Sequence, residues 1–217
     1  MFLRGPYRLE ARQPNMTEIQ FQCRNWYHFL WLSGDDVPQS LVHNIDRMCW
    51  ILHEKSPEWA FGLGGRSASF GEVYGDMFDH HTVVYEYKDG PRLYALCRTQ
   101  NGCYGNSGDI IMGTKGQCDL AHCKITGETN WQFDDKKQNN PYLAEQAALV
   151  EAIKNGKPIN SGYHMVNATL IGVMGQIACY DGREVRFDEV SQSGLQFEPS
   201  PDEAGFETPP PSVPDET

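Results

Sequence analysis

Two apolar segments that flank a tight turn constrain this chain more than any other feature. Thr82–Tyr87 and Arg92–Arg98 alternate between apolar and polar residues, and residues 88–91 (KDGP) join them. Alternation with a period of two indicates strands with one buried face. An Asp-Gly pair readily takes the positive φ values that a hairpin turn requires. The sequence therefore predicts an antiparallel hairpin with Val83 and Tyr85 on the same face.

Further elements are predicted on either side of this hairpin. Ile19–Leu32 is aromatic-rich and partly alternating, which predicts a strand or a pair of strands. Apolar residues at helical spacing predict a helix over Val37–Glu54, with Asp36 as N-cap and Pro38 in the first turn. Short strands are expected at Trp59–Leu63, Asp109–Met112, Gln117–Ala121, His122–Ile125, Thr129–Phe133 and Glu184–Phe187.

Two helices are expected towards the end of the folded part. Asn140 and Pro141 are typical first residues of a helix. Its inward face would be formed by Leu143, Ala147, Val150 and Ile153. The apolar stripe of the second helix would be formed by Val166, Leu170, Val173 and Ile177. Strands followed by helices predict an α+β fold: an open, mostly antiparallel β-sheet with helices packed on one face.

The composition changes at both ends of the chain. Residues 1–15 carry Gly5, Pro6 and Pro14 among charged residues, which predicts an extended arm or linker remnant, as in a truncated protein. Residues 16–190 are predicted to form one domain. Residues 191–217 contain many Pro, Glu, Ser and Asp residues and no Lys or Arg, so we expect a disordered acidic tail.

Charge and composition exclude several classes of protein. The net charge of −11 and the lack of a basic cluster argue against nucleic acid as a partner. No segment approaches the roughly 18 consecutive apolar residues of a transmembrane helix, so no membrane partner is expected. Seven scattered Cys residues indicate free thiols rather than a disulfide framework. Together with the lack of a visible signal peptide, they predict a cytoplasmic protein.

The sequence predicts no cofactor-binding residues and no metal site. A dinucleotide fingerprint requires G-x-G-x-x-G between a strand and a helix, and the nearest segment, Gly62–Ser67, ends in Ser with no helix after it. Cys118–Cys123 gathers two Cys, an Asp and a His, but the second pair of ligands that a zinc site usually needs is missing. On a strand, His80 and His81 would point to opposite faces and could not easily share a metal.

His43 and Asp46 are the best candidates for catalysis on spacing alone. Three residues apart on a helix, they lie on one face. Asp46 could orient one ring nitrogen of His43 and leave the other for proton transfer. The alternative is an ordinary helical His that hydrogen-bonds to its neighbours.

The sequence resembles the Gfo/Idh/MocA-type oxidoreductases over most of its length. The likeness begins with NWYHFLWLSGDD and VHNID and runs through YGDMFDHHTVVYEYKDG, IIMGTKG and NPYLAEQAALVEAIKNGKPIN to VNATLIGVMGQIACYDGREVRFDEV. These segments occur in the family's order from Arg4 to Val190. They match only its C-terminal part, so the resemblance implies a chain without the family's N-terminal Rossmann domain.

The resemblance implies a substrate and oligomerisation domain. In the complete enzyme an N-terminal domain would hold NAD or NADP, and no cofactor is expected on this chain alone. The family's catalytic His aligns with His43 and a family Asp with Asp46. Gln39 stands where the family usually has an acidic residue, and the family's catalytic Lys belongs to the missing domain. Asn25, Trp26, Tyr27 and Trp31 would line the substrate pocket.

The sequence thus predicts the substrate-binding and oligomerisation part of an NAD(P)-dependent sugar or polyol oxidoreductase, inactive in redox chemistry alone. We expect a homo-oligomer that forms through the open face of the sheet. One alternative is a non-catalytic carbohydrate-binding or assembly module. A second alternative is part of an NAD-assisted glycosidase or lyase of the same family.

Overall fold

The computed structural model describes residues 1–88, 90–134 and 139–196. Within them the chain forms two compact units: one contains residues 1–107 and those from 166 onward, and the other contains residues 108–165. The single domain predicted for residues 16–190 stays a prediction, because a compact unit is not by itself an independently folding domain. The acidic tail predicted for residues 191–217 lies largely outside the described residues.

The larger unit is built on a six-stranded sheet with the strand order β10-β2-β3-β4-β1-β5. Neighbouring strands are antiparallel, except that β1 and β4 run parallel. The strands are β1 (Phe2–Arg4), β2 (Trp59–Gly65), β3 (His80–Glu86), β4 (Arg92–Thr99), β5 (Asn106–Ser107) and β10 (Val185–Arg186). The predicted hairpin is confirmed as β3 and β4, in which Val83 pairs with Ala95 and Tyr85 with Leu93.

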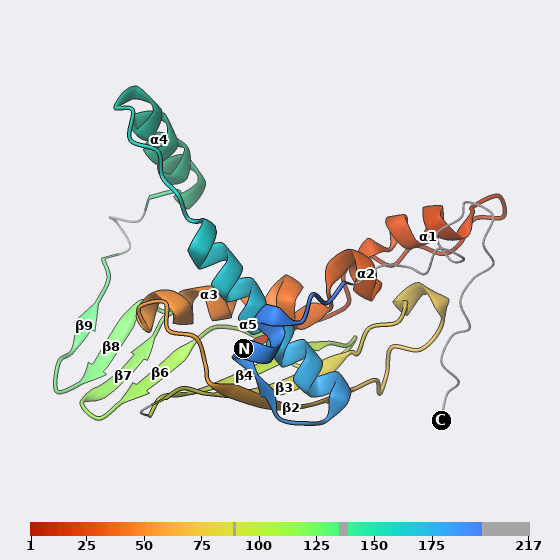
Figure 1. Ribbon diagram of the computed structural model, residues 1–217, viewed down its shortest axis with the longest axis horizontal. Helices are drawn as coiled ribbons and strands as arrows, with labels where there is room; N and C mark the ends of the chain where they lie inside the picture. Colours follow the sequence, from red (N-terminus) through yellow and green to blue (C-terminus); the bar gives the residue numbers. More distant parts are fainter. Residues whose placement is uncertain (89, 135–138, 197–217) are drawn as a thin grey trace. The chain divides into compact units, whose positions relative to one another are not determined.

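The helices of the larger unit lie on one face of this sheet (Figure 1). They are α1 (Glu18–Arg24), α2 (Leu30–Ser33), α3 (Val42–Ile51), α5 (Gly162–Asp181), which enters the unit at Val166, and α6 (Phe187–Gln192). A π-helical turn at Val37–Leu41 precedes α3, and 3-10 turns lie at Trp26–His28 and Glu72–Tyr74. The predicted α+β fold with a mostly antiparallel sheet is confirmed.

The smaller unit contains a four-stranded antiparallel sheet and one helix. The strands, in sheet order, are β6 (Ile110–Gly113), β7 (Gly116–Asp119), β8 (Lys124–Gly127) and β9 (Trp131–Gln132), and the helix is α4 (Pro141–Lys154). Asn140 caps α4 as predicted, because its side chain accepts hydrogen bonds from two backbone N–H groups of the first turn. The inward face predicted for α4 is wrong. Leu143 and Ile153 are 69% and 71% exposed, since none of the described residues of this unit covers them.

The core of the larger unit lies between the sheet and the helices α3 and α5. Leu41, Ile45 and Cys49 recur at helical spacing and are buried against the sheet residues Val83 and Tyr85. The helix predicted over Val37–Glu54 is therefore confirmed in its apolar face, although its first turn is π-helical.

The buried face of α5 is shifted from its prediction. Ile171, Met174 and Ala178 are completely buried, whereas Val166 is 51% exposed and the other predicted positions are only partly buried. Gly172 and Gly175 lie on this buried face, where the lack of a side chain lets the helix backbone approach its neighbours closely. A Cβ on Gly172 would lie 2.9 Å from the backbone of Pro38.

The segment Ile19–Leu32 is helical, so its prediction as strands is wrong. It forms α1, a 3-10 turn and α2 in succession. The side chain of Gln20 accepts a hydrogen bond from the backbone N–H of Thr17, which fixes the start of α1. Aromatic residues favour strands only weakly, and packing overrides this preference: Phe21 and Phe29 are buried in edge-to-face contact, 6.1 Å apart.

The first residues of the chain are part of the sheet. Phe2–Arg4 pairs in parallel with β4, and Phe2 lies opposite Cys97. The remainder of the predicted arm packs on the segment around α1. Arg12 donates to Glu18 and Glu72, and its guanidinium lies over the ring of Phe21.

The packing of α5 on β3 gives a first prediction. A Cβ on Gly175 would lie within 3 Å of the ring of Tyr85, which is fully buried and has no room to move. We expect Gly175→Ala to lower the free energy of unfolding by about 1–3 kcal/mol through overpacking. Gly105→Ala is the control, since its Cβ would meet only an ordinary contact at 3.5 Å. Equal urea midpoints for both variants would contradict this packing.

Candidate functional site

The chain enters the candidate site through an unusual turn. Gly34 and Asp35 both have positive φ angles, 76° and 84°, and for a residue with a side chain this conformation costs about 1–2 kcal/mol. The π-helical turn and α3 follow directly. Asp36 precedes the π-helical turn as predicted, but its side chain makes no capping hydrogen bond. Other contacts must therefore hold the turn.

A buried ion pair provides one of these contacts. His81 Nε2, in the middle of the sheet, lies 2.8 Å from Asp35 Oδ2, and both side chains are completely inaccessible. Burial alone would lower the pKa of His81, but the Asp35 carboxylate outweighs this effect and the pKa is raised. Cys97 Sγ lies 3.6 Å from the other ring nitrogen. Burial holds the pKa of this thiol well above its usual range, so the Cys97–His81–Asp35 row is structural rather than nucleophilic.

A second buried network surrounds Asp36. Tyr27 donates from its hydroxyl to Asp36 Oδ1 at 2.8 Å and also contacts Ser40 Oγ. Arg4 lies 3.6 Å from Asp36, donates to Ser40, and stacks over the ring of Tyr27 at 4.6 Å. Burial raises the pKa of the Asp36 carboxyl. These contacts tie the start of the chain and the 3-10 turn at Trp26–His28 to the turn that precedes α3.

The predicted catalytic pair lies on the exposed face of α3. His43 is in the first turn of the helix, Asp46 follows three residues later, and both are exposed. Trp50, one heptad after His43, is 74% exposed on the same side. The opposite side of α3 carries Ile45 and Cys49 and is buried. α3 is thus firmly packed on one side and exposes an imidazole, a carboxylate and an indole on the other.

Two of the predicted substrate-binding residues are buried. Asn25 is 1% exposed, and its amide exchanges hydrogen bonds with the backbone of Glu10 in both directions. Tyr27 is 3% exposed, and its hydroxyl belongs to the network of Asp36. The polar groups of both residues therefore support the fold around the site, and their contact with a substrate stays a prediction.

The other two predicted residues are more accessible. Trp26 is 38% exposed and packs edge-to-face on Tyr7 and Tyr27. Trp31 is partly buried, and its Nε1–H donates to Gln22 at 2.6 Å. Trp26 can offer an aromatic surface to a ligand, whereas Trp31 mainly anchors the helix that precedes the turn.

The segment closest to a nucleotide-binding loop is occupied by a side chain of the protein itself. Gly62–Ser67 forms the end of β2 and a loop. The backbone N–H groups of residues 67–69 all donate to the carboxylate of Asp79. His80 also donates to Asp79, and although burial opposes the effect, these hydrogen bonds hold the pKa of Asp79 far below its usual range. As predicted, His80 and His81 point to opposite faces of the sheet: their side chains are 43% and 0% exposed.

Neither a metal site nor a membrane span is found in the part of the chain that the structure describes. Within residues 1–88, 90–134 and 139–196, no three His, Cys, Asp or Glu side chains could jointly hold a metal ion. His122 and Asp119, from the Cys-rich segment, form an exposed pair of their own at 2.8 Å. No helix in these ranges is both long and apolar enough to cross a bilayer.

The fold of this chain is similar to that of several solved structures. No protein-family model and no curated protein matches the chain. Among solved structures, GenD2 from gentamicin A biosynthesis in complex with NAD is 18% identical, with a TM-score of 0.53 over 75% of this chain and 51% of GenD2. An oxidoreductase from Thermotoga maritima is 18% identical, with a TM-score of 0.54 over 87% of this chain and 52% of that protein.

A third structure is an oxidoreductase from Agrobacterium radiobacter in complex with NAD+, L-tartaric acid and magnesium. It is 15% identical, with a TM-score of 0.54 over 86% of this chain and 57% of that protein. The chain spans about half the length of these three proteins. At such identities the likeness shows the fold alone, which this chain shares with part of each of these solved structures.

The buried pair predicts a pH dependence of stability. Because the pKa of His81 is raised by folding, the pair stabilises fully below about pH 6.5, the usual value of an unfolded His, and less as the pH rises through the folded value. We expect Asp35→Asn to cost about 3–5 kcal/mol at pH 6 and clearly less at pH 9. Urea unfolding at both pH values measures this cost.

The matched control is His122→Gln, which removes an imidazole from an exposed pair. It should change the free energy of unfolding by less than about 0.5 kcal/mol at either pH. A cost of Asp35→Asn that stays constant or increases from pH 6 to pH 9 would contradict a charged pair.

Proposed function

We propose that this chain is the substrate-binding and oligomerisation part of an NAD(P)-dependent oxidoreductase that acts on a sugar or polyol. The observation that carries the proposal is the exposed face of α3, where His43 and Asp46 stand on a helix whose other face is buried. The matched solved structures, two of them in complexes with NAD, support the class of reaction.

His43 would be the acid–base group of this reaction. Its imidazole would accept the proton of the substrate hydroxyl as the carbinol carbon is oxidised, and it would return the proton in the reverse direction. Asp46 would orient the ring and stabilise its protonated form. A nicotinamide held by another domain would exchange the hydride. Without that domain we expect no redox turnover by this chain.

The buried contacts at the start of α3 would serve catalysis by positioning His43 and Asp46. The buried pair of Asp35 with His81 and the network of Asp36, Tyr27 and Ser40 hold both ends of the turn that starts the helix. Catalytic groups act efficiently when their supporting residues cannot move. The side chain of Gln39 is uncharged and accepts a hydrogen bond from Ser40. Asp46 would therefore be the carboxylate that assists His43.

The proposal predicts a substrate-dependent change at His43 in the chain alone. Proton NMR of the imidazole C–H signals, with glucose, myo-inositol and sorbitol at millimolar concentrations, should show shifts of the His43 signals. The His43→Gln variant assigns these signals by their loss. His53 and His122, which are exposed elsewhere, serve as internal controls. Unchanged His43 signals with every polyol, or equal shifts at His122, would refute a substrate site at α3.

A further inference from the structure

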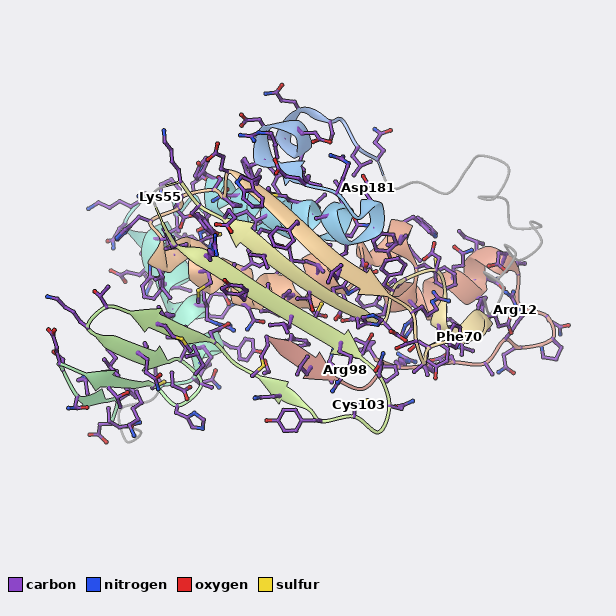
Figure 2. All side chains as sticks on the ribbon, turned by 90° about the horizontal axis from the view of Figure 1, so that it is seen from below. Arg12, Lys55, Phe70, Arg98, Cys103 and Asp181 are labelled. Atoms are coloured by element: carbon purple, nitrogen blue, oxygen red, sulfur yellow. The ribbon has the colours of Figure 1, made fainter. Side chains whose placement is uncertain are left out.

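The four-stranded sheet of the smaller unit carries a hollow on one of its faces. Figure 2 shows its strands side by side (green), with their side chains as sticks. The hollow has a volume of about 460 Å³, which is within the usual range of roughly 300–1,000 Å³ for sites that bind small molecules. Residues of the turn between β6 and β7 and residues that follow β8 form part of its lining.

The strand register explains why the sheet is hollowed at this place. Gly113 lies beside Gly116, which lies beside Gly127, so one row across three strands has no side chains. A Cβ on Gly116 would clash with the carbonyl oxygen of Thr126, and a Cβ on Gly127 would clash with that of Lys115. Because both clashes are with the backbone, neither position accepts a side chain unless the strands move apart. The hollow is therefore a fixed feature of this sheet.

One side of the hollow is apolar. Ile111 lies beside Cys118, which lies beside Ile125, in the next row on the same face of the sheet. All three residues line the hollow. Trp131 continues this row on β9 and is 50% exposed. The row thus offers a surface on which an aliphatic or aromatic group of a ligand is removed from water.

The other side of the hollow carries one positive and one negative charge. Lys115 belongs to the turn between β6 and β7, Glu128 follows β8, and both are exposed and line the hollow. The backbone N–H of Glu128 donates to the carbonyl oxygen of Lys115 at 2.8 Å, which holds the two residues next to each other. Within the described ranges of the chain, neither side chain belongs to an ion pair. Both charges are therefore available to a ligand.

An α-amino acid with a large apolar side chain matches this arrangement. Its carboxylate would pair with Lys115, its ammonium group with Glu128, and its side chain would lie on the row of Ile111 and Ile125. Its Cα would lie over the row of glycines, where no side chain projects from the sheet. A polyol fits less well, because it would leave both charges unpaired and would cover the apolar row with hydroxyl groups.

We propose that this hollow is a binding site for an α-amino acid with a large apolar side chain, such as phenylalanine or leucine. Lys115 binds the carboxylate, Glu128 binds the ammonium group, and the row of Ile111 contacts the side chain. This inference goes beyond the proposed oxidoreductase function and does not depend on it, because His43 belongs to the larger unit.

Titration calorimetry of the full chain with three related compounds tests the two charges. Phenylalanine carries both charges of an amino acid, 3-phenylpropionate only the carboxylate, and 2-phenylethylamine only the ammonium group. At low salt we expect phenylalanine to bind with a millimolar or lower Kd and the other two compounds more weakly. Lys115→Gln should weaken the binding of phenylalanine and phenylpropionate about three-fold, as expected for an exposed ion pair, but not that of phenylethylamine. Glu128→Gln should weaken phenylalanine and phenylethylamine but not phenylpropionate.

Filling the hollow tests the position of the site. A Cβ on Gly113 would have its nearest neighbour at 3.7 Å, an ordinary contact, so this glycine accepts a side chain that projects into the hollow. Gly113→Val should weaken phenylalanine binding at least about ten-fold through overlap with the ligand. The control is Met112→Val on the same strand, whose side chain points to the other face of the sheet and is 81% exposed. It should bind phenylalanine like the wild type.

Circular dichroism establishes that each variant is folded. The absence of any heat of binding with phenylalanine and leucine at millimolar concentrations would refute the site. Binding that Gly113→Val leaves unchanged would overturn the assignment to this hollow. Equal effects of Lys115→Gln and Glu128→Gln on all three compounds would overturn the roles given to the two charges. None of these results bears on the NMR test at His43, so the two proposals fail separately.

Discussion

The ion pair between Asp35 and His81 is the contact on which the rest of this structure depends. It joins the turn before α3 to the middle of the sheet, with both side chains completely buried. A buried charge is stable only when it is paired, so neither residue can leave its place without strong destabilisation. The pair holds Asp35 in a left-handed conformation. This fixes the direction in which the chain enters the π-helical turn and α3.

The larger unit consists of a layer of helices on one face of the sheet. α3 packs its apolar side on the sheet, and α5 covers the same face beside it, brought close by Gly172 and Gly175. The outward sides of both layers carry the surfaces of interest. α3 presents His43 and Asp46 on one side, and the sheet exposes Phe61, Leu63, Tyr94 and Leu96 on the other. These two surfaces are therefore held by one core but do not share a residue.

The sequence predicted the elements whose local pattern agrees with their environment. The β3–β4 hairpin, the apolar face of α3 and the cap of α4 by Asn140 all depend on neighbours within a few residues. The wrong predictions concern segments whose structure depends on the presence or absence of contacts with other segments. Ile19–Leu32 is helical because Phe21 and Tyr27 are buried and lie against Arg12 and Arg4 of the preceding segment. The apolar stripe of α4 is exposed because none of the described residues of its unit covers it. The candidate site shows the same division. His43 and Asp46 are neighbours in the sequence, but 46 residues separate Asp35 from His81, and no local pattern joins them.

In the function that we propose, this chain supplies the substrate side of an oxidoreductase while another domain holds the nicotinamide. The segment closest to a nucleotide loop, Gly62–Ser67, ends at the first of three successive backbone N–H groups that donate to the carboxylate of Asp79. Titration calorimetry of NADH into the purified chain, at concentrations that detect millimolar binding, tests the claim most directly. We expect no heat of binding of NADH. Saturable binding of NADH to the chain alone would mean that it contains a nucleotide site of its own, and the division of the enzyme proposed above would be wrong.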